Sequence, residues 1–132
     1  MSASSARAAE ERTPSVSSLD RDAVVCERCE IADTAPTRLR GLLGRRELRP
    51  GEGMLLRPSN SVHTAFMRFP IDAVFLDAEL RVLKVRGELR PWRAAGARRA
   101  RAVLELAAGE AARRGVSVGE RLELTSPSGA ER

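Results

Sequence analysis

The sequence interrupts every apolar stretch after a few residues, which limits the chain to short buried elements. Its longest apolar runs have only four residues, as at residues 73–76. A bilayer-spanning helix needs about 18 such residues, and the N-terminus has no apolar core of a signal peptide. We therefore expect no membrane span and a cytoplasmic protein.

Several segments carry strand signals. Residues 71–76 are nearly all apolar, and residues 77–79 favour a turn into residues 80–85, which predicts a hairpin. Residues 23–32 suit an exposed or edge strand, and a strand starting near Ser61 is interrupted at Pro70, because proline donates no ladder hydrogen bond. Residues 102–106 predict a short buried strand, and residues 121–125 a last one.

Two short helices are expected between these strands. Asp33 or Thr34 can cap the first, whose apolar side chains include Leu39 and Leu42. The second covers residues 107–114 and ends at Gly115. Many short strands with two short helices predict a mainly β fold, a compact β-barrel or β-sandwich with the two helices on its surface.

The 132 residues fit one domain. Residues 1–20 are rich in Ser, Ala, Arg and Glu and predict a disordered N-terminal tail, and residues 126–132 predict a disordered C-terminal tail. The folded domain is expected at residues 22–125. Residues 87–100 show no periodicity and predict a long loop.

The net charge is +5, and 22 of the 23 basic side chains are arginine. Such a balance can attract nucleic acid, but single-strand binding also uses aromatic stacking, and the chain has three Phe, one Trp and no Tyr. The arginines are scattered along the sequence apart from residues 45–46 and 98–101. We therefore favour a solvated charged surface over nucleic-acid binding.

Residues 38–45, 53–56, 61–77, 103–109 and 115–120 carry the motifs RLRGLLGR, GMLL, SVHTAFMRFPIDAVFLD, VLELAAG and GVSVGE. In this order and spacing the chain, over about residues 24–124, resembles domain of unknown function 192 (DUF192), a bacterial and archaeal family. The resemblance implies a compact, mainly β single domain and no established activity. Relatives near genes for pilus or secretion machinery imply an accessory role with such partners.

His63 is the only histidine, so any histidine-dependent chemistry must use it. Asp72 falls on a strand face with Val74 and Leu76, and Glu105 shares a face with Val103. A buried carboxylate must be paired or hydrogen-bonded. Asp72 could accept bonds from backbone amides near the bend at residues 69–70 or from Arg40, or it could form an acid-base pair with Glu105.

Cys26 and Cys29 form a Cys-x-x-Cys pair without the second pair that a zinc site normally needs. In a regular strand these positions point to opposite faces, so we interpret them as free thiols and expect no metal and no cofactor. Trp92 lies in the long loop and could anchor a partner or cap the core.

Three functions remain open at this point. The first is a non-enzymatic accessory module that binds a small ligand or protein partner around His63, Arg68 and Trp92. The second is an enzyme of unknown reaction that uses His63 with Asp72 or Glu105, and it requires these side chains to share a cleft. The third is an arginine-driven nucleic-acid binder, which requires a continuous basic face.

Overall fold

The structure is a computed structural model that describes residues 13–126, except for the side chains of Leu39 and Arg40. The predicted mainly β fold with two short helices is confirmed, although the sheets do not close into a barrel. The elements are β1 (Ser15–Ser18), β2 (Ala23–Cys26), β3 (Arg28–Ala32), α2 (Ala35–Arg40), β4 (Glu52–Leu56), β5 (Ser61–His63), β6 (Ile71–Leu76), β7 (Val82–Leu89), β8 (Ala94–Gly96), β9 (Ala102–Ala107), α3 (Glu110–Arg113) and β10 (Leu122–Thr125).

A five-stranded sheet with the order β3-β4-β9-β6-β7 forms the centre of the fold. Its neighbouring strands are antiparallel except for the parallel pair β3 and β4. The predicted hairpin is the pair β6 and β7, and β7 continues to Leu89, into residues expected to be loop. Both central strands, β6 and β9, are buried along their whole length, as expected for strands covered on both faces.

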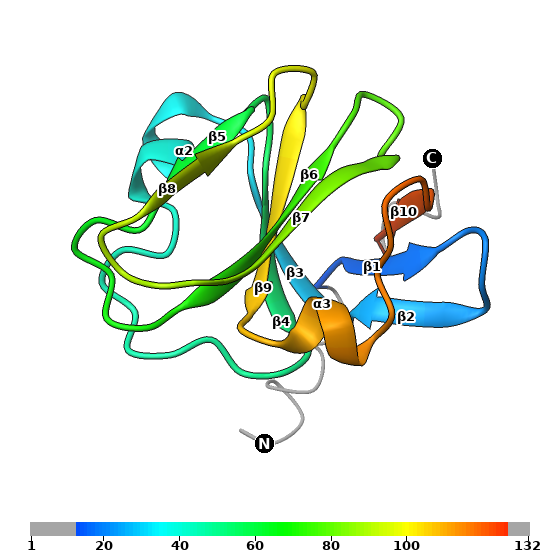
Figure 1. Ribbon diagram of the computed structural model, residues 1–132, viewed down its shortest axis with the longest axis horizontal. Coiled ribbons are helices and arrows are strands. Elements are labelled where there is room, and N and C mark those ends of the chain that lie inside the picture. The colour runs from blue at the N-terminus through cyan, green and yellow to red at the C-terminus, as the bar shows by residue number, and fades with distance from the viewer. Residues whose placement is uncertain (1–12, 127–132) are drawn as a thin grey trace, which may run out of the picture.

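The two faces of this sheet pack against different layers (Figure 1). On one face, Val74 and Leu104 pack with side chains of the three-stranded sheet β10-β1-β2 and of α3. On the other, Phe75 and Val103 pack with side chains of the β5-β8 ribbon and of the chain after α2. Successive side chains of a strand point to opposite faces of the sheet, so alternate residues of β6 and β9 belong to two separate hydrophobic cores, one on each face.

The prediction of a disordered tail over residues 1–20 is wrong for residues 13–20, whereas residues 1–12 lie outside the described residues. Strand β1 pairs antiparallel with both β2 and β10, and its Val16 is buried. The burial of Val16 and the pairing with two strands order this segment although its composition is polar. The folded region therefore starts before residue 22, the start expected from the sequence. At the C-terminal end, residues 127–132 lie outside the described residues.

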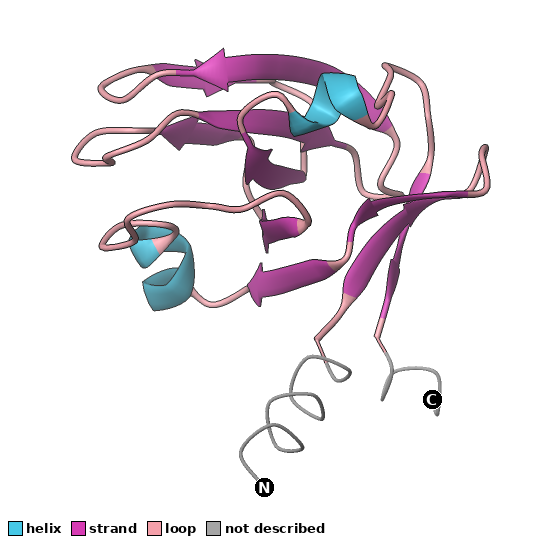
Figure 2. Cartoon of the chain, turned by 90° about the horizontal axis from the view of Figure 1, so that it is seen from below, coloured by secondary structure: helices cyan, strands magenta, loops and turns pink. Residues whose placement is uncertain are grey.

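The two helices lie apart at the periphery of the strands (Figure 2). Of the two caps that the sequence left open, Asp33 and Thr34, it is Thr34 that caps α2, in a capping box with Thr37. Helix α3 is shorter than the expected range 107–114, because β9 extends to Ala107 and Gly109 adopts a left-handed conformation with φ of 89°. No helix within residues 13–126 is long and apolar enough to cross a membrane.

Candidate functional site

A pocket of about 110 Å³ lies between the C-terminal end of α2, β5 and β9. The pairing of β5 with β8 places this ribbon over the face of the large sheet that carries Phe75 and Val103. Polar groups from three parts of the chain meet in the pocket. It is lined by Arg38, Gly41, Leu42, Leu43, Leu56, Ser59, Ser61, Val62, His63, Met67 and Glu105.

Glu105 is the buried polar group of this pocket. It is 4% exposed, and its Oε1 atom has no hydrogen-bond partner within the described part of the chain. The neighbouring residues in the sheet, Met54 and Ala73, offer it no polar side chain. Burial raises the pKa of Glu105 to about 7, because desolvation penalises the charged carboxylate. The carboxyl group can therefore accept or release a proton near neutral pH.

His63 lines the same pocket from the end of β5, where its backbone pairs with Ala94. Its side chain is exposed. The sequence predicted that His63 could meet a carboxylate, and the structure brings it to one pocket with Glu105. Ser59 adds a hydroxyl group that donates to the Ser61 carbonyl oxygen at 3.0 Å.

Asp72 lies on the opposite face of the same sheet, so it shares no cleft with His63 or Glu105. Directly paired residues on neighbouring strands share a face. Asp72 pairs with Leu106 and shares the Val74 face, whereas Glu105 pairs with Ala73 on the Phe75 face. The acid-base pair of Asp72 and Glu105 that the sequence left open is therefore wrong.

The Asp72 carboxylate is 1% exposed and is fully engaged by backbone amides. Its Oδ1 accepts hydrogen bonds from the Glu88 N–H at 2.8 Å and the Gly109 N–H at 3.0 Å, and its Oδ2 accepts one from the Ala111 N–H at 2.8 Å. The donors come from the end of β7 and the start of α3, not from the predicted bend at residues 69–70. The side chain of Arg40, the other predicted donor, lies outside the described residues.

Trp92 and Arg68 are exposed and do not line the Glu105 pocket. The Trp92 ring packs against the ring of Phe66, with centroids 4.7 Å apart and planes tilted by 60°. Trp92 therefore neither caps the core nor belongs to the pocket. Sequence reasoning missed Phe66, because it lies in the strand predicted from near Ser61 to Pro70. In the structure β5 ends at His63, and Phe66 adopts a left-handed φ of 66°.

The buried side chain of Thr64 holds the two aromatic loops together. Its hydroxyl oxygen lies 2.5 Å from the Arg90 carbonyl oxygen and accepts a hydrogen bond from the Arg93 N–H at 2.9 Å. Its backbone N–H donates to the Arg93 carbonyl, and its carbonyl accepts from the Trp92 N–H. The sequence gives no sign that Thr64 joins these loops, because its partner Arg90 lies 26 residues further along the chain.

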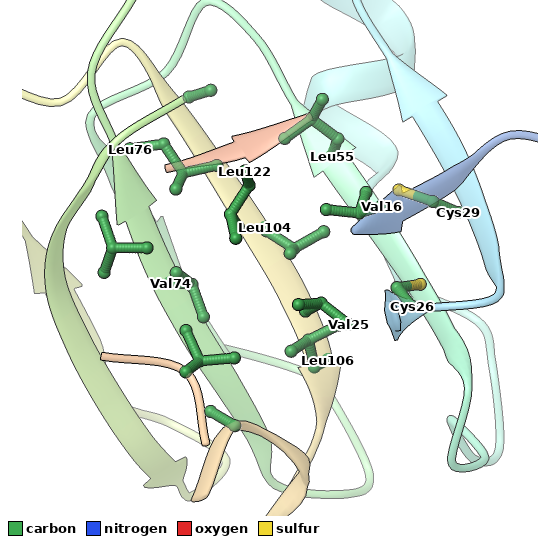
Figure 3. Packing of buried hydrophobic residues seen from close by; sticks show 14 residues of the cluster. Val16, Val25, Cys26, Cys29, Leu55, Val74, Leu76, Leu104, Leu106 and Leu122 are labelled. Atoms are coloured by element: carbon green, nitrogen blue, oxygen red, sulfur yellow. The ribbon is translucent and has the colours of Figure 1, made fainter. Parts of the chain in front are cut away.

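Cys26 and Cys29 are both buried in the core cluster between the large and the three-stranded sheet (Figure 3). The expectation that they face opposite ways is wrong, because the chain leaves β2 at Cys26 and starts β3 at Arg28. The Cys26 thiol donates to the carbonyl oxygens of Arg28 and Gly51, and the Cys29 thiol donates to that of Glu30. The neighbouring Cys29 side chain lowers the pKa of Cys26, whereas the Cys26 side chain and burial raise the pKa of Cys29. Within residues 13–126, no group of three or more His, Cys, Asp or Glu is placed to hold a metal ion.

Comparisons with known proteins agree with the fold. The DUF192 family model (Uncharacterized ACR) matches residues 17–124. A protein of unknown function from Novosphingobium aromaticivorans is similar, with 28% identity and a TM-score of 0.72 over 83% of this chain and 82% of that one. A putative transcription regulator from Sinorhizobium meliloti has 26% identity and a TM-score of 0.70 over 83% and 90%. A search of curated proteins gave no match.

Proposed function

The chain belongs to the DUF192 family, and we propose that it binds a small polar ligand in the pocket between α2, β5 and β9. The observation that carries this proposal is the buried Oε1 atom of Glu105, which has no partner within the described residues and borders the pocket. A buried carboxyl oxygen without a hydrogen bond destabilises the fold. A ligand that donates a hydrogen bond to it removes this cost and gains affinity in return.

The dimensions and polar groups of the pocket define the ligand class. Its volume of about 110 Å³ is small beside the roughly 300–1,000 Å³ of drug-sized sites, so it suits a short ligand or the end of a longer one. Glu105 favours an amine or a hydroxyl group at the inner end. Arg38 and His63 line the same pocket and can contact acceptor groups of the ligand.

Three probes of three or four non-hydrogen atoms test this chemistry: ethylammonium donates and is charged, ethanol donates and is neutral, and acetate is an anion with no donor. We expect ethylammonium and ethanol, but not acetate, to shift the backbone amide signals of Leu42, Ser61 and Glu105 in NMR spectra. Affinities should be about millimolar, because so few atoms contact the protein. Ethylammonium should bind more tightly as the pH rises through about 7, where the Glu105 carboxylate forms.

Glu105→Gln should abolish the pH dependence of ethylammonium binding. Glu79→Gln is the matched control, because Glu79 is exposed in the turn between β6 and β7. Equal binding of acetate and ethylammonium, or unchanged ethylammonium binding in Glu105→Gln, would contradict the proposal.

A second candidate is proton-transfer catalysis. It is favoured by one observation, that a carboxyl group with a pKa of about 7 shares its pocket with the histidine of the chain. In that case His63 and Glu105 exchange protons with a bound substrate, and Asp72 takes no part. Chemical conversion of a bound ligand distinguishes catalysis from binding alone.

A further inference from the structure

The charge of the chain is concentrated in two segments. Residues 57–71 and 81–101 together contain ten basic and one acidic side chain, a formal net charge of +9. The rest of the chain contains 13 basic and 17 acidic side chains, a net charge of −4. The overall value of +5 therefore hides a strongly basic region and a mildly acidic remainder.

Six of these basic residues lie in β7, in the loop before β8 and in the turn that follows β8. Lys84 and Arg86 of β7 pair with Phe75 and Ala73, so they lie on the side of the sheet that the β5-β8 ribbon covers. The Lys84 Nζ atom donates to the Gly96 carbonyl oxygen at 2.8 Å. The loop before β8 carries Arg90 and Arg93, and the turn after β8 carries Arg98 and Arg99. We call this surface the basic face, and it comprises Lys84, Arg86, Arg90, Arg93, Arg98 and Arg99.

Carboxylates do not neutralise the basic face. Within residues 13–126, none of its side chains forms an ion pair, whereas Arg21, Arg45 and Arg114 elsewhere pair with glutamates. All six basic side chains are exposed. A surface of this kind attracts a polyanion and releases its counterions on binding.

An exposed aromatic pair adjoins the basic face. Phe66 is 73% and Trp92 59% exposed, and Arg90 and Arg93 flank Trp92 in the sequence. Both aromatic residues adopt left-handed backbone conformations, which bulky side chains rarely do. Thr64 fixes both loops, so two of the four aromatic side chains of the protein are held in solvent beside arginines that form no ion pair within the described residues.

The geometry points to a binding surface for single-stranded nucleic acid, with phosphates on the basic face and a base stacked on the Trp92–Phe66 pair. Aromatic rings stack on bases only where these are unpaired, so the exposed pair favours a single strand over a duplex. The low aromatic count suggested a solvated surface from the sequence, but stacking requires the rings to be exposed and placed beside the charge. This surface is separate from Glu105, so it stands independently of the ligand pocket.

Fluorescence anisotropy with a labelled thymidine oligomer of about 12 nucleotides tests the proposal. The single strand should bind more tightly than the same oligomer in a duplex, and a uridine oligomer of equal length shows whether DNA or RNA is preferred. Trp92→Ala should weaken binding about 5- to 160-fold, and Phe66→Ala should act in the same direction. Both side chains are largely exposed, and thermal unfolding of each variant checks that the fold is retained.

Matched variants separate specific contacts from overall charge. Arg90→Gln should reduce the slope of log affinity against log salt by about 0.7, as expected for one lost phosphate contact. Arg121→Gln removes the same charge from an exposed position outside the basic face and should leave the slope unchanged. Failure to bind at low salt, equal affinity for duplex, unchanged affinity of Trp92→Ala, or equal effects of the two arginine variants would overturn the proposal.

Discussion

Asp72→Ala is expected to lower the free energy of unfolding by about 3–5 kcal/mol. The Asp72 carboxylate is buried and accepts three backbone hydrogen bonds, from Glu88, Gly109 and Ala111. Each stranded buried donor costs roughly 1–3 kcal/mol. Since small domains have a total stability of about 5–15 kcal/mol, the loss should be visible as a much lower urea midpoint.

Asp22→Ala is the control, because Asp22 is exposed and its side chain makes no hydrogen bond within the described residues. Its urea midpoint should stay close to that of the parent. A parent-like midpoint for Asp72→Ala would show that the three hydrogen bonds do not hold β7 and α3 to β6.

Glu105→Gln is expected to have the opposite effect at alkaline pH. The folded state raises the pKa of Glu105 from 4.5 to about 7, so it holds the proton more tightly than the unfolded state does. The contribution of this group to stability is therefore greatest below pH 4.5 and is lost as the pH rises to about 7. Glutamine does not titrate, so the stability of Glu105→Gln relative to the parent should improve by about 3 kcal/mol between about pH 4 and about pH 8.

Urea denaturation of both proteins across this pH range measures the difference. Glu79→Gln, whose side chain is in solvent when folded and unfolded, should keep the pH profile of the parent. A stability difference between Glu105→Gln and the parent that is the same at both pH values would mean that Glu105 is paired or solvated in the folded state. A carboxyl group that costs stability at neutral pH fits a residue retained for binding.

The sequence predicted the local elements better than their assembly. The apolar run of β6 and the turn that follows it specify a hairpin by composition alone, and Thr34 specifies the start of α2. Strand β1 could not be predicted in this way, because it lies between β2 and β10 in its sheet, and β10 follows it by about 100 residues in the sequence. Non-local pairing leaves little trace in a polar segment such as residues 15–18.

The candidate site shows the same division. His63, Glu105 and Asp72 stand out in the sequence as a lone histidine and two carboxylates in apolar strands. Only the register of β6 against β9, with Ala73 opposite Glu105, decides that Asp72 belongs to the scaffold and Glu105 to the pocket. A shift of one residue would exchange these faces, and composition alone does not set the register.

The most direct test of a ligand-binding carboxyl group in this pocket is a carbon-13 NMR titration of the Glu105 side chain in the intact protein. The buried oxygen, which has no hydrogen-bond partner within residues 13–126, predicts a pKa of about 7. Saturating ethylammonium should lower this pKa, because a bound cation favours the carboxylate. A Glu105 pKa at or below its ordinary value of 4.5 in the free protein, or one that ethylammonium leaves unchanged, would contradict the proposal.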